Sequence, residues 1–495
     1  MDATQRAAQA WGCGAAVTAA VLARTAYLAS EPTRAITGTP DDAFYYLRLA
    51  NNFVRLGHWT FDGESATSGF HLLHGYLLAL ANLVLGDRGL EWITMLVVVS
   101  VFASLCFGLA TVLLVRVAQH RLSVAAGWWV PAVMLSPIAL GVSTMMMESH
   151  LVVLAGAAVV YATAVGGWTG RWGRVGLVGL GVIAATTRID FALLPVVAWL
   201  AHQLHARTDP EGARRALLVA IGAVAGFVVT VGHTFVVSGT PLPTSVTTKL
   251  TWSAARPIAF FQLLQAFDLA LLALVLVAAI SALRQGREFW LTSEPVTLGS
   301  VLAMLGYAAF YATATAGAGL WYVASLVVPI AVILASVGKQ VADRWSARAA
   351  AAVAVVASLG CLTPGVAGLQ TMTWPWHVSL LHAAQSLRDD SSIEHLGAWN
   401  AGILSVISGK TVTNLDGLVD DRAARAASGQ AKFDYLRERG IDDLADAAHH
   451  VNDGVTNADT PIARCYLPVR MLSAADDPPS SNGPVWLFTY QPGCS

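Results

Sequence analysis

The sequence has few charged residues. Only 12% of its 495 residues are Asp, Glu, Lys or Arg, whereas 55% are hydrophobic and the mean hydropathy is +0.58. Soluble domains contain about 25% charged residues, so this scarcity excludes an ordinary soluble protein and indicates a polytopic membrane protein. The formal net charge is −1 and no basic stretch occurs, so nothing in the sequence indicates a nucleic acid partner.

A clean signal-peptide cleavage site is also missing. An apolar segment, residues 7–28, follows Arg6 as in a signal peptide, but residues 27–31 contain no clean small-x-small motif. We therefore expect this segment to remain in the protein as a membrane anchor. The sequence also has no internal repeat of fixed period.

Eleven apolar stretches are long enough to be candidate membrane spans. They cover residues 8–28, 91–115, 124–142, 149–166, 175–190, 191–205, 216–237, 258–283, 295–315, 321–338 and 349–368. The stretch 71–85 is shorter, and we expect a helix that lies at the membrane interface. The loops rich in Arg and Lys then all fall on one side, which the positive-inside rule makes cytoplasmic. The N-terminus is thus inside, and residues 29–90 form a large external loop.

The composition becomes polar near residue 370, and turn signals appear. Residues 395–406 and 485–490 are predicted strands, and the pattern of residues 416–444 is mostly helical. We therefore predict a mainly α protein. Residues 1–369 form a transmembrane bundle of about 11 helices, and residues 370–495 form a soluble α/β domain on the extracytoplasmic side of the plasma membrane.

Cysteine is scarce too. Three of the five cysteines lie in apolar segments, where a free thiol behaves as a small hydrophobe, and Cys465 and Cys494 lie in the polar C-terminal region. A disulfide between these two requires that the region faces an oxidising compartment. The predicted topology meets this condition, so we predict the Cys465–Cys494 disulfide.

Ionisable residues gather at the external ends of the predicted spans, where such groups are costly and usually mark a site or a buried pair. They are Asp41, Asp42, Glu148, Arg188, Asp190 and Lys249. Each also has a structural explanation. The acids at 41 and 42 suit the first turn of a helix, Arg188 and Asp190 could form a local ion pair, and Lys249 could reach lipid headgroups. Together, they predict one polar external cavity.

The residues after the two acids have an amphipathic helical pattern. One face is apolar and the opposite face is polar. The apolar residues are Ala43, Tyr46, Leu47, Ala50, Phe53 and Val54, and the opposite side has Asp42, Tyr45, Arg48, Asn52 and Arg55. We expect this helix to lie along the membrane surface with its acidic N-terminus at a fixed place. The alternative is a helix packed on the protein's own core.

Several segments together resemble the GT-C superfamily of membrane glycosyltransferases, which draw sugar from a polyprenyl-phosphate donor. They are DDAFYYLRLANNFVRLGHWTFDG, TSGFH, MMMESHL, TTRIDFALL, SGTPLPTSVTTKL, GLWYVASLVVPIAVIL and IEHLGAWNAGILSVISGKTVTNLDGLVDD. The resemblance covers nearly the whole chain, and the chain is most similar to the arabinofuranosyltransferases that build mycobacterial cell-wall glycans.

The resemblance implies an inverting transfer from a polyprenyl-phosphate sugar to a cell-envelope glycan or glycolipid acceptor, with Asp41 as the general base. Asp42 could orient Asp41, contact the acceptor or, with Asp41, help hold a divalent cation. A cation is the only cofactor left open, and no nucleotide is expected. Arg188 and Lys249 are candidates to bind the donor phosphate. Candidate substrate contacts are Glu148, Asp190, His71 and Trp59, although a surface or packing role is commoner for such a histidine and interfacial anchoring for such a tryptophan.

A transporter or flippase of lipid-linked sugars is the alternative function. Transporters usually have polar residues near mid-membrane and an inverted repeat of hydropathy. Here the centres of the spans are almost purely apolar and the charges cluster at one face. This pattern favours the enzyme.

Overall fold

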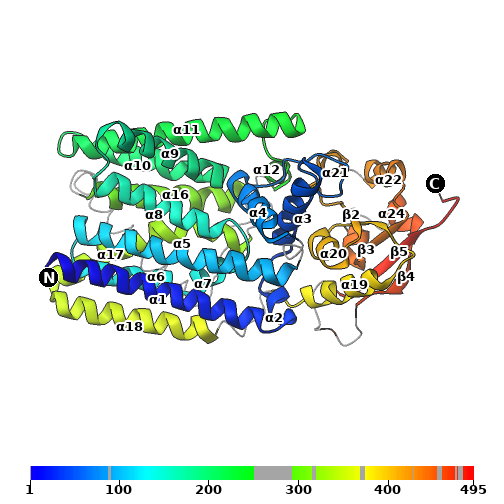
Figure 1. Ribbon diagram of the computed structural model, residues 1–495, viewed down its shortest axis with the longest axis horizontal. Helices are drawn as coiled ribbons and strands as arrows, with labels where there is room; N and C mark the ends of the chain where they lie inside the picture. Colours follow the sequence, from blue (N-terminus) through cyan, green and yellow to red (C-terminus); the bar gives the residue numbers. More distant parts are fainter. Residues whose placement is uncertain are drawn as a thin grey trace.

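The computed structural model describes residues 2–86, 91–249, 293–314, 319–367, 374–426, 429–453, 460–473, 477 and 483–494. Figure 1 shows a bundle of long helices, with the N-terminus at its far end, and a smaller α/β part near the C-terminus. Helices α2 (Pro32–Thr37), α3 (Asp41–Leu56) and α4 (Leu72–Leu85) lie where these two parts meet. The predicted fold class, mainly α with a small sheet region at the C-terminus, is confirmed.

Helical segments cover ten of the eleven stretches predicted as spans. They are α1 (Ala3–Ala29), α5 (Trp92–Arg121), η2–α6–α7 (Ala126–Trp129, Val130–Met134, Pro137–Ser143), α8 (Ser149–Ala164), α9 (Gly170–Thr187), η3–α10 (Ile189–Ala192, Leu193–Leu204), α11 (Pro210–Ser238), α16 (Pro295–Ala314), η4–α17 (Leu320–Val323, Ala324–Arg344) and α18 (Ala347–Ala367). The stretch 258–283 lies outside the described residues, as does the predicted domain boundary at 369–370.

Helix length alone does not confirm the predicted number of spans. Among the described residues, four helices are long and apolar enough to cross a membrane, or five if the pair Ala126–Met134 and Pro137–Ser143 is one broken span. This pair is bent by 60°. The other helices of the bundle do not meet this combined criterion of length and hydropathy within the described residues.

Local sequence signals explain where several helices begin. Asp2 caps α1 through a capping box with Gln5, and Ser136 accepts a hydrogen bond from the backbone of Ala139 just before Pro137. Asp209 caps α11 in the same way, with Pro210 in the first helical position. These caps satisfy backbone N–H groups that have no partner inside their own helix.

Small residues allow close helix packing in the bundle. A Cβ atom on Gly181 of α9 would lie 2.0 Å from the carbonyl oxygen of Val219, and one on Gly222 of α11 would lie 2.0 Å from that of Val178. On the other side, a Cβ on Gly108 of α5 would lie 2.0 Å from the Thr18 hydroxyl of α1. Such small-residue contacts are typical of helices that associate in membranes, where van der Waals packing replaces the hydrophobic effect.

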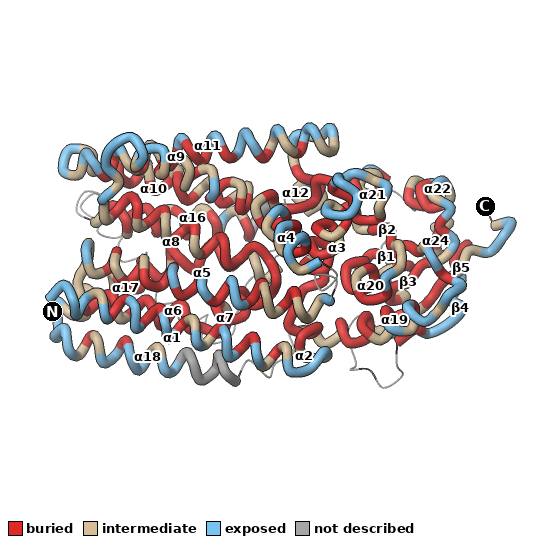
Figure 2. Tube along the Cα trace, viewed as in Figure 1, coloured by how far each residue is buried: buried red, intermediate tan, exposed pale blue. Residues whose placement is uncertain are grey.

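Helix α3 does not lie on an open surface as predicted. Most of its predicted apolar face is buried, although Phe53 is half-buried and Val54 is exposed. Tyr45 and Asn52 of the face predicted to be polar are buried too. The C-terminal part covers Tyr45, Asn52 donates to the backbone of residues 60 and 61, and Figure 2 shows α3 largely in the buried colour. The packed alternative is therefore the correct one. The helix begins at Asp41 after Pro40, without a side-chain cap.

The C-terminal part contains a mixed five-stranded sheet in the order β2-β1-β3-β5-β4. Its strands are β1 (His395–Ala398), β2 (Thr411–Asn414), β3 (Asp443–Ala447), β4 (Tyr466–Met471) and β5 (Val485–Tyr490). Strand β1 pairs in parallel with β2 and β3, whereas β5 pairs antiparallel with β3 and β4. Helices α19 (His377–Asp389), α20 (Ala401–Ser408), α21 (Asp421–Arg425), α22 (Gly429–Glu438), α23 (Ala448–Asp453) and α24 (Pro461–Cys465) complete this part.

One strand prediction in this part is half wrong. The apolar stretch 395–406 is strand only as far as Ala398, and its remainder forms α20, because a short apolar run does not distinguish a strand from a buried helix. The stretch 485–490 is β5, as predicted. The structure also has a Cys465–Cys494 disulfide, which joins α24 to the end of the chain with a Cα–Cα distance of 5.5 Å.

Candidate active site

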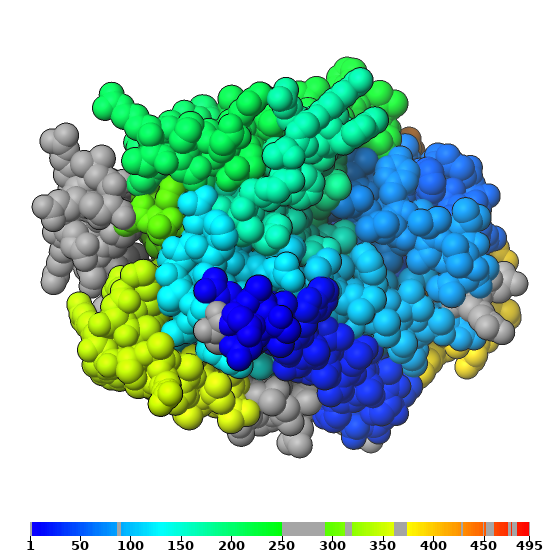
Figure 3. All heavy atoms as spheres, turned by 60° about the vertical axis from the view of Figure 1, so that its left-hand side comes forward, coloured from blue at the N-terminus to red at the C-terminus, as the bar shows by residue number. Residues whose placement is uncertain are grey.

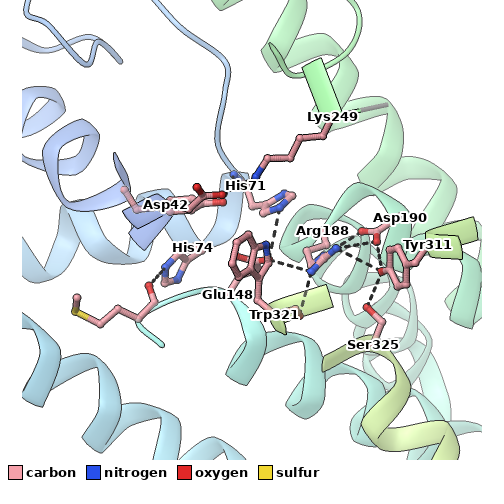
Figure 4. Close-up of polar contacts among 12 residues, drawn as sticks. Asp42, His71, His74, Glu148, Arg188, Asp190, Lys249, Tyr311, Trp321 and Ser325 are labelled. Carbon is pink, nitrogen blue, oxygen red and sulfur yellow. Dashed lines mark hydrogen bonds and ion pairs between the residues drawn. The ribbon is translucent and has the colours of Figure 1, made fainter. Parts of the chain in front are cut away.

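A cavity of about 90 Å³ lies at the junction of the bundle, α3 and the C-terminal part. We call it the junction cavity. Its polar lining includes Asp42 at the start of α3, His71 before α4, Arg188 and Asp190 between α9 and α10, and Lys249 at the end of α12 (Thr244–Lys249). Segments far apart in the sequence therefore bring five of the predicted site residues together (Figure 4).

Asp42 and Lys249 form an ion pair across the cavity. Lys249 Nζ donates a hydrogen bond to Asp42 Oδ2 at 2.6 Å, and the two side chains are 22% and 21% exposed, respectively. The ammonium group also lies 5.3 Å from the centre of the Trp321 ring. Burial disfavours the charged form of Lys249, but the carboxylate of Asp42 more than offsets this, so the pKa of Lys249 is raised above its ordinary value. Lys249 is therefore a charged group that faces the cavity.

Arg188 lies in a closed network of acids. Its guanidinium donates to Glu148 Oε1 at 3.1 Å and to both carboxylate oxygens of Asp190 at 3.1 and 2.9 Å, and its side chain is only 1% exposed. Tyr311 donates to the same Asp190 carboxylate, and the Tyr322 ring lies 4.8 Å from the guanidinium carbon. Two carboxylates thus already neutralise Arg188, which the structure places deeper than Lys249.

Glu148 and the loop histidines form the floor beside this network. Glu148 is fully buried and does not line the cavity, and its Oε1 lies 3.6 Å from His71 Nε2. Burial lowers the pKa of His71, so the imidazole is neutral near pH 7. His74 is buried next to it and its Nε2 lies 3.0 Å from the carbonyl oxygen of Met146. Of the sequence-predicted substrate contacts, His71 and Asp190 therefore line the cavity, and Glu148 supports them from behind.

Asp41 is directed away from the junction cavity. Its carboxylate accepts hydrogen bonds from the backbone N–H groups of Gly402, at 3.1 Å, and Ile403, at 2.7 Å, in the first turn of α20. The residue is 8% exposed and is absent from the lining. Burial raises its pKa to about 7, although the two N–H groups act in the opposite direction. The structure thus places Asp41 in the contact between α3 and the C-terminal part.

Tyr45 and Asp416 extend this contact, and the sequence did not identify either as a site residue. The Tyr45 hydroxyl lies 3.0 Å from Asp416 Oδ2 and accepts a hydrogen bond from the Asn414 amide at 3.1 Å. Burial raises the pKa of Asp416 to about 6. The only signal in the sequence was the segment NLDGLVDD, which contains Asp416 and was part of the family resemblance.

Trp59 is not a cavity residue either. It is 3% exposed, and its ring lies 4.3 Å from Phe53 and 4.2 Å from Phe70, measured between ring centres. Its indole N–H donates to the Tyr76 hydroxyl at 3.4 Å. The indole therefore fills an aromatic core between α3 and α4. Trp321 and Tyr322 line the cavity instead, from the start of η4–α17.

The two acids do not converge on one point that could bind a metal. Asp42 pairs with Lys249 and Asp41 with α20. In the described part of the chain, no three His, Cys, Asp or Glu side chains are arranged so that they could hold a metal ion.

Solved structures share this architecture. ArnT from Cupriavidus metallidurans bound to undecaprenyl phosphate matches over 92% of this chain and 94% of its own, with 12% identity and a TM-score of 0.57. The Archaeoglobus fulgidus oligosaccharyltransferase tethered with an acceptor peptide matches over 97% of this chain and 74% of its own, with 10% identity and a TM-score of 0.55. This chain has a GT-C-type fold. No protein-family model matches the chain, and no curated protein matches it in sequence.

The fold and the apolar helices together identify a multi-pass membrane protein. Both matched proteins are GT-C glycosyltransferases. At 10–12% identity, the likeness establishes the fold and leaves the chemistry to be argued from this chain's own residues. The similarity to arabinofuranosyltransferases in particular remains a prediction from the sequence.

Proposed function

We propose that this protein is an inverting glycosyltransferase that moves a sugar from a polyprenyl-phosphate donor to a glycan or glycolipid acceptor of the cell envelope. The observation that supports this most strongly is the pairing of a carboxylate and a charged ammonium group in one buried cavity, Asp42 with Lys249. Transfer from a lipid-linked sugar needs both groups: a base for the acceptor hydroxyl and a cation for the departing phosphate.

Lys249 is the best candidate to bind the donor phosphate. It is charged and partly accessible, and its one carboxylate partner among the described residues is Asp42. The singly charged phosphodiester of the donor would compete with Asp42 for the same ammonium group, because both are anionic oxygen acceptors. Donor binding would therefore release the carboxylate at the moment when it is needed.

Asp42 is then the group that the geometry favours as general base. Its carboxylate lies in the cavity beside Lys249, whereas that of Asp41 accepts two hydrogen bonds from α20. The family resemblance assigns the base to Asp41, and that assignment is the alternative that the experiment below must exclude. In our proposal, Asp41 holds the C-terminal part against α3 and so fixes the first turn from which Asp42 projects.

Arg188 would support the donor site without binding the phosphate as its main partner. Its fork is already occupied by Glu148 and Asp190, and a guanidinium with two carboxylate partners offers little charge to a third anion. The network instead holds Asp190 and His71 rigidly at the cavity wall. Such preorganised groups lower the cost of arranging a site during the reaction.

We further propose that the cavity opens on the extracytoplasmic side. Basic side chains join helix ends at the opposite end of the bundle: Arg121 donates to Ala164 O and to Asp209, and Arg215 donates to Thr163 O. Under the positive-inside rule, that end faces the cytoplasm. The Cys465–Cys494 disulfide at the other end suits an oxidising compartment.

A transfer assay in vitro tests the proposal. Purified protein is given synthetic polyprenyl-phosphate arabinofuranose, mannose or glucose with a candidate acceptor, and product is measured for wild type, Asp42→Asn and Asp41→Asn. We expect transfer from one of these donors and its loss in Asp42→Asn. Movement of a lipid-linked sugar between leaflets without any glycan product would instead support the transporter.

A further inference from the structure

A second cavity lies within the bundle, away from the junction cavity. This apolar groove has a volume of about 470 Å³ and runs between α1 and α18, with the bent segment η2–α7 as its floor. Figure 1 shows α1 and α18 along the same edge of the bundle, and Figure 3 shows the dark-blue start of α1 at the surface of the bundle's N-terminal end. The α1 wall consists of small residues: Gly12, Cys13, Ala16, Ala19, Ala20 and Ala23.

Arg24 is the one charged residue of this lining, and it is 7% exposed. Its Nε donates to the Thr144 hydroxyl at 2.9 Å, and no other hydrogen bond of its guanidinium is found within the described residues. In that same part of the chain, no carboxylate lies within 4.0 Å of it. Arg188, in contrast, has two such partners. A buried guanidinium without a counterion is costly, and none is found among the described residues, so an anion that enters the groove would stabilise Arg24.

The dimensions of the groove fit one leaflet of a bilayer. The lining extends along α1 from Gly12 to Arg24, which at a rise of about 1.5 Å per residue is roughly 18 Å. This length is close to half of a hydrocarbon core of about 30 Å. Arg24 lies near the end of α1, Ala29, on the side of the C-terminal part. The cation is thus at headgroup depth, and the apolar wall continues toward the middle of the bilayer.

We infer that this groove binds an anionic phospholipid of the leaflet that contains the junction cavity. One acyl chain lies along the small residues of α1, and the phosphate accepts hydrogen bonds from the two terminal nitrogens of Arg24, in the bidentate geometry that guanidinium groups favour with phosphates. A groove that spans one leaflet suits an acyl chain better than a longer polyprenyl chain. This inference is independent of the proposed sugar transfer, because no residue of the groove lines the junction cavity.

The test is native mass spectrometry and thermal unfolding of the full chain purified in mild detergent. We expect wild type to retain an anionic phospholipid and to gain a few degrees in Tm from added phosphatidylglycerol but not from phosphatidylcholine. Arg24→Met removes the cation and keeps an unbranched apolar side chain. It should weaken phosphatidylglycerol binding by about tenfold or more, the effect of losing a charge-assisted contact.

A second variant keeps the test decisive if Arg24→Met does not fold. Ala16→Leu fills the groove without changing a charge and should also abolish lipid retention, whereas Ala26→Leu, on an exposed part of α1 outside the groove, should not. The inference is overturned if both groove variants retain the phospholipid with wild-type affinity. It is also overturned if the retained molecule is a polyprenyl phosphate, or if a neutral lipid binds equally well.

Discussion

Asp41 and Asp42 are neighbours in the sequence, but they contact different parts of the molecule. Asp42 pairs with Lys249 in the junction cavity, and Asp41 accepts two backbone hydrogen bonds from α20 of the C-terminal part. Successive residues of an α-helix point roughly 100° apart, so adjacent side chains in one first turn cannot serve the same point. In our proposal, one helix end therefore carries the base, Asp42, and fixes its position through Asp41.

The two acids also differ in what would happen if each were lost. Asp42 is 21% exposed and lines the cavity, so its loss removes a charge that faces the cavity. Around Asp41 the surroundings are packed, and Gly402 is so close that a Cβ there would lie 2.3 Å from the Asp41 carbonyl oxygen. We therefore expect changes near Asp42 to affect turnover and changes near Asp41 to affect the contact between α3 and the C-terminal part.

Asp42→Asn should give the largest effect. An amide cannot take the acceptor proton, so we expect kcat to fall by about 10²- to 10⁴-fold, the usual contribution of general base catalysis. Thermal unfolding should stay close to that of wild type, because Asn keeps the size and the hydrogen-bonding capacity of the side chain. Initial rates of transfer from the active polyprenyl-phosphate donor measure the fall in kcat. A variant with normal turnover would remove Asp42 from the chemistry.

Lys249→Met should have the next largest effect. Loss of a contact between a cation and a phosphate costs about 1.5–3 kcal/mol, or roughly 10- to 100-fold in kcat/KM for the donor. Lys249→Arg is the matched control because it keeps the charge, and it should recover part of the loss. Initial rates at varied donor concentration give kcat/KM for both variants. Equal activity of Lys249→Met and wild type would contradict a role in phosphate binding.

Gly402→Ala should weaken the contact between Asp41 and α20. The new methyl group must displace Asp41 or α20, and such overpacking costs about 1–3 kcal/mol of stability. Hydrogen exchange should therefore become faster in α20 than in α11. Gly232→Ala is the matched control, since a Cβ there meets nothing within 4 Å. If α20 exchanges at the wild-type rate in Gly402→Ala, the close contact with Asp41 is not present in solution.

The pH dependence of stability that comes from Asp41 should be a smaller effect. Burial raises the Asp41 pKa from 3.8 to about 7, so the folded state binds this proton more tightly than the unfolded state. The resulting stability is fully present below about pH 4 and is lost as pH rises through about 7. In Asp41→Asn this part of the pH dependence should vanish. The midpoints of thermal unfolding of wild type and Asp41→Asn, measured from about pH 5 to about pH 8, give this difference in stability.

The sequence predicted much of the junction cavity. Of the six ionisable residues that the topology put at one end of the bundle, Asp42, Arg188, Asp190 and Lys249 line the cavity, whereas Asp41 and Glu148 do not. Loop ends that share one side of a bundle converge for geometric reasons alone, so charge placement was enough for these four. His71, a candidate substrate contact, lines the cavity too. Their chemical roles are still predictions.

The contact between α3 and the C-terminal part could not be predicted in the same way. Asp41 meets Gly402 and Ile403, more than 300 residues later, through backbone N–H groups that have no signature in the sequence. The same docking buries Tyr45, and residues 60 and 61 bury Asn52, although an amphipathic pattern assigned both to an open polar face. Trp59 was a candidate substrate contact but lies in an aromatic core. The sequence could not separate these roles, because an aromatic residue in a loop is equally suited to a sugar and to an aromatic core.

The most direct test of this account compares the maximal transfer rates of Asp41→Asn and Asp42→Asn in one preparation, at saturating donor and at a temperature where both are folded. The account predicts that Asp41→Asn retains most of the wild-type rate, whereas Asp42→Asn is folded and nearly inactive. The reverse pattern, a fast Asp42→Asn and an inactive but stable Asp41→Asn, would contradict it and return the base to Asp41.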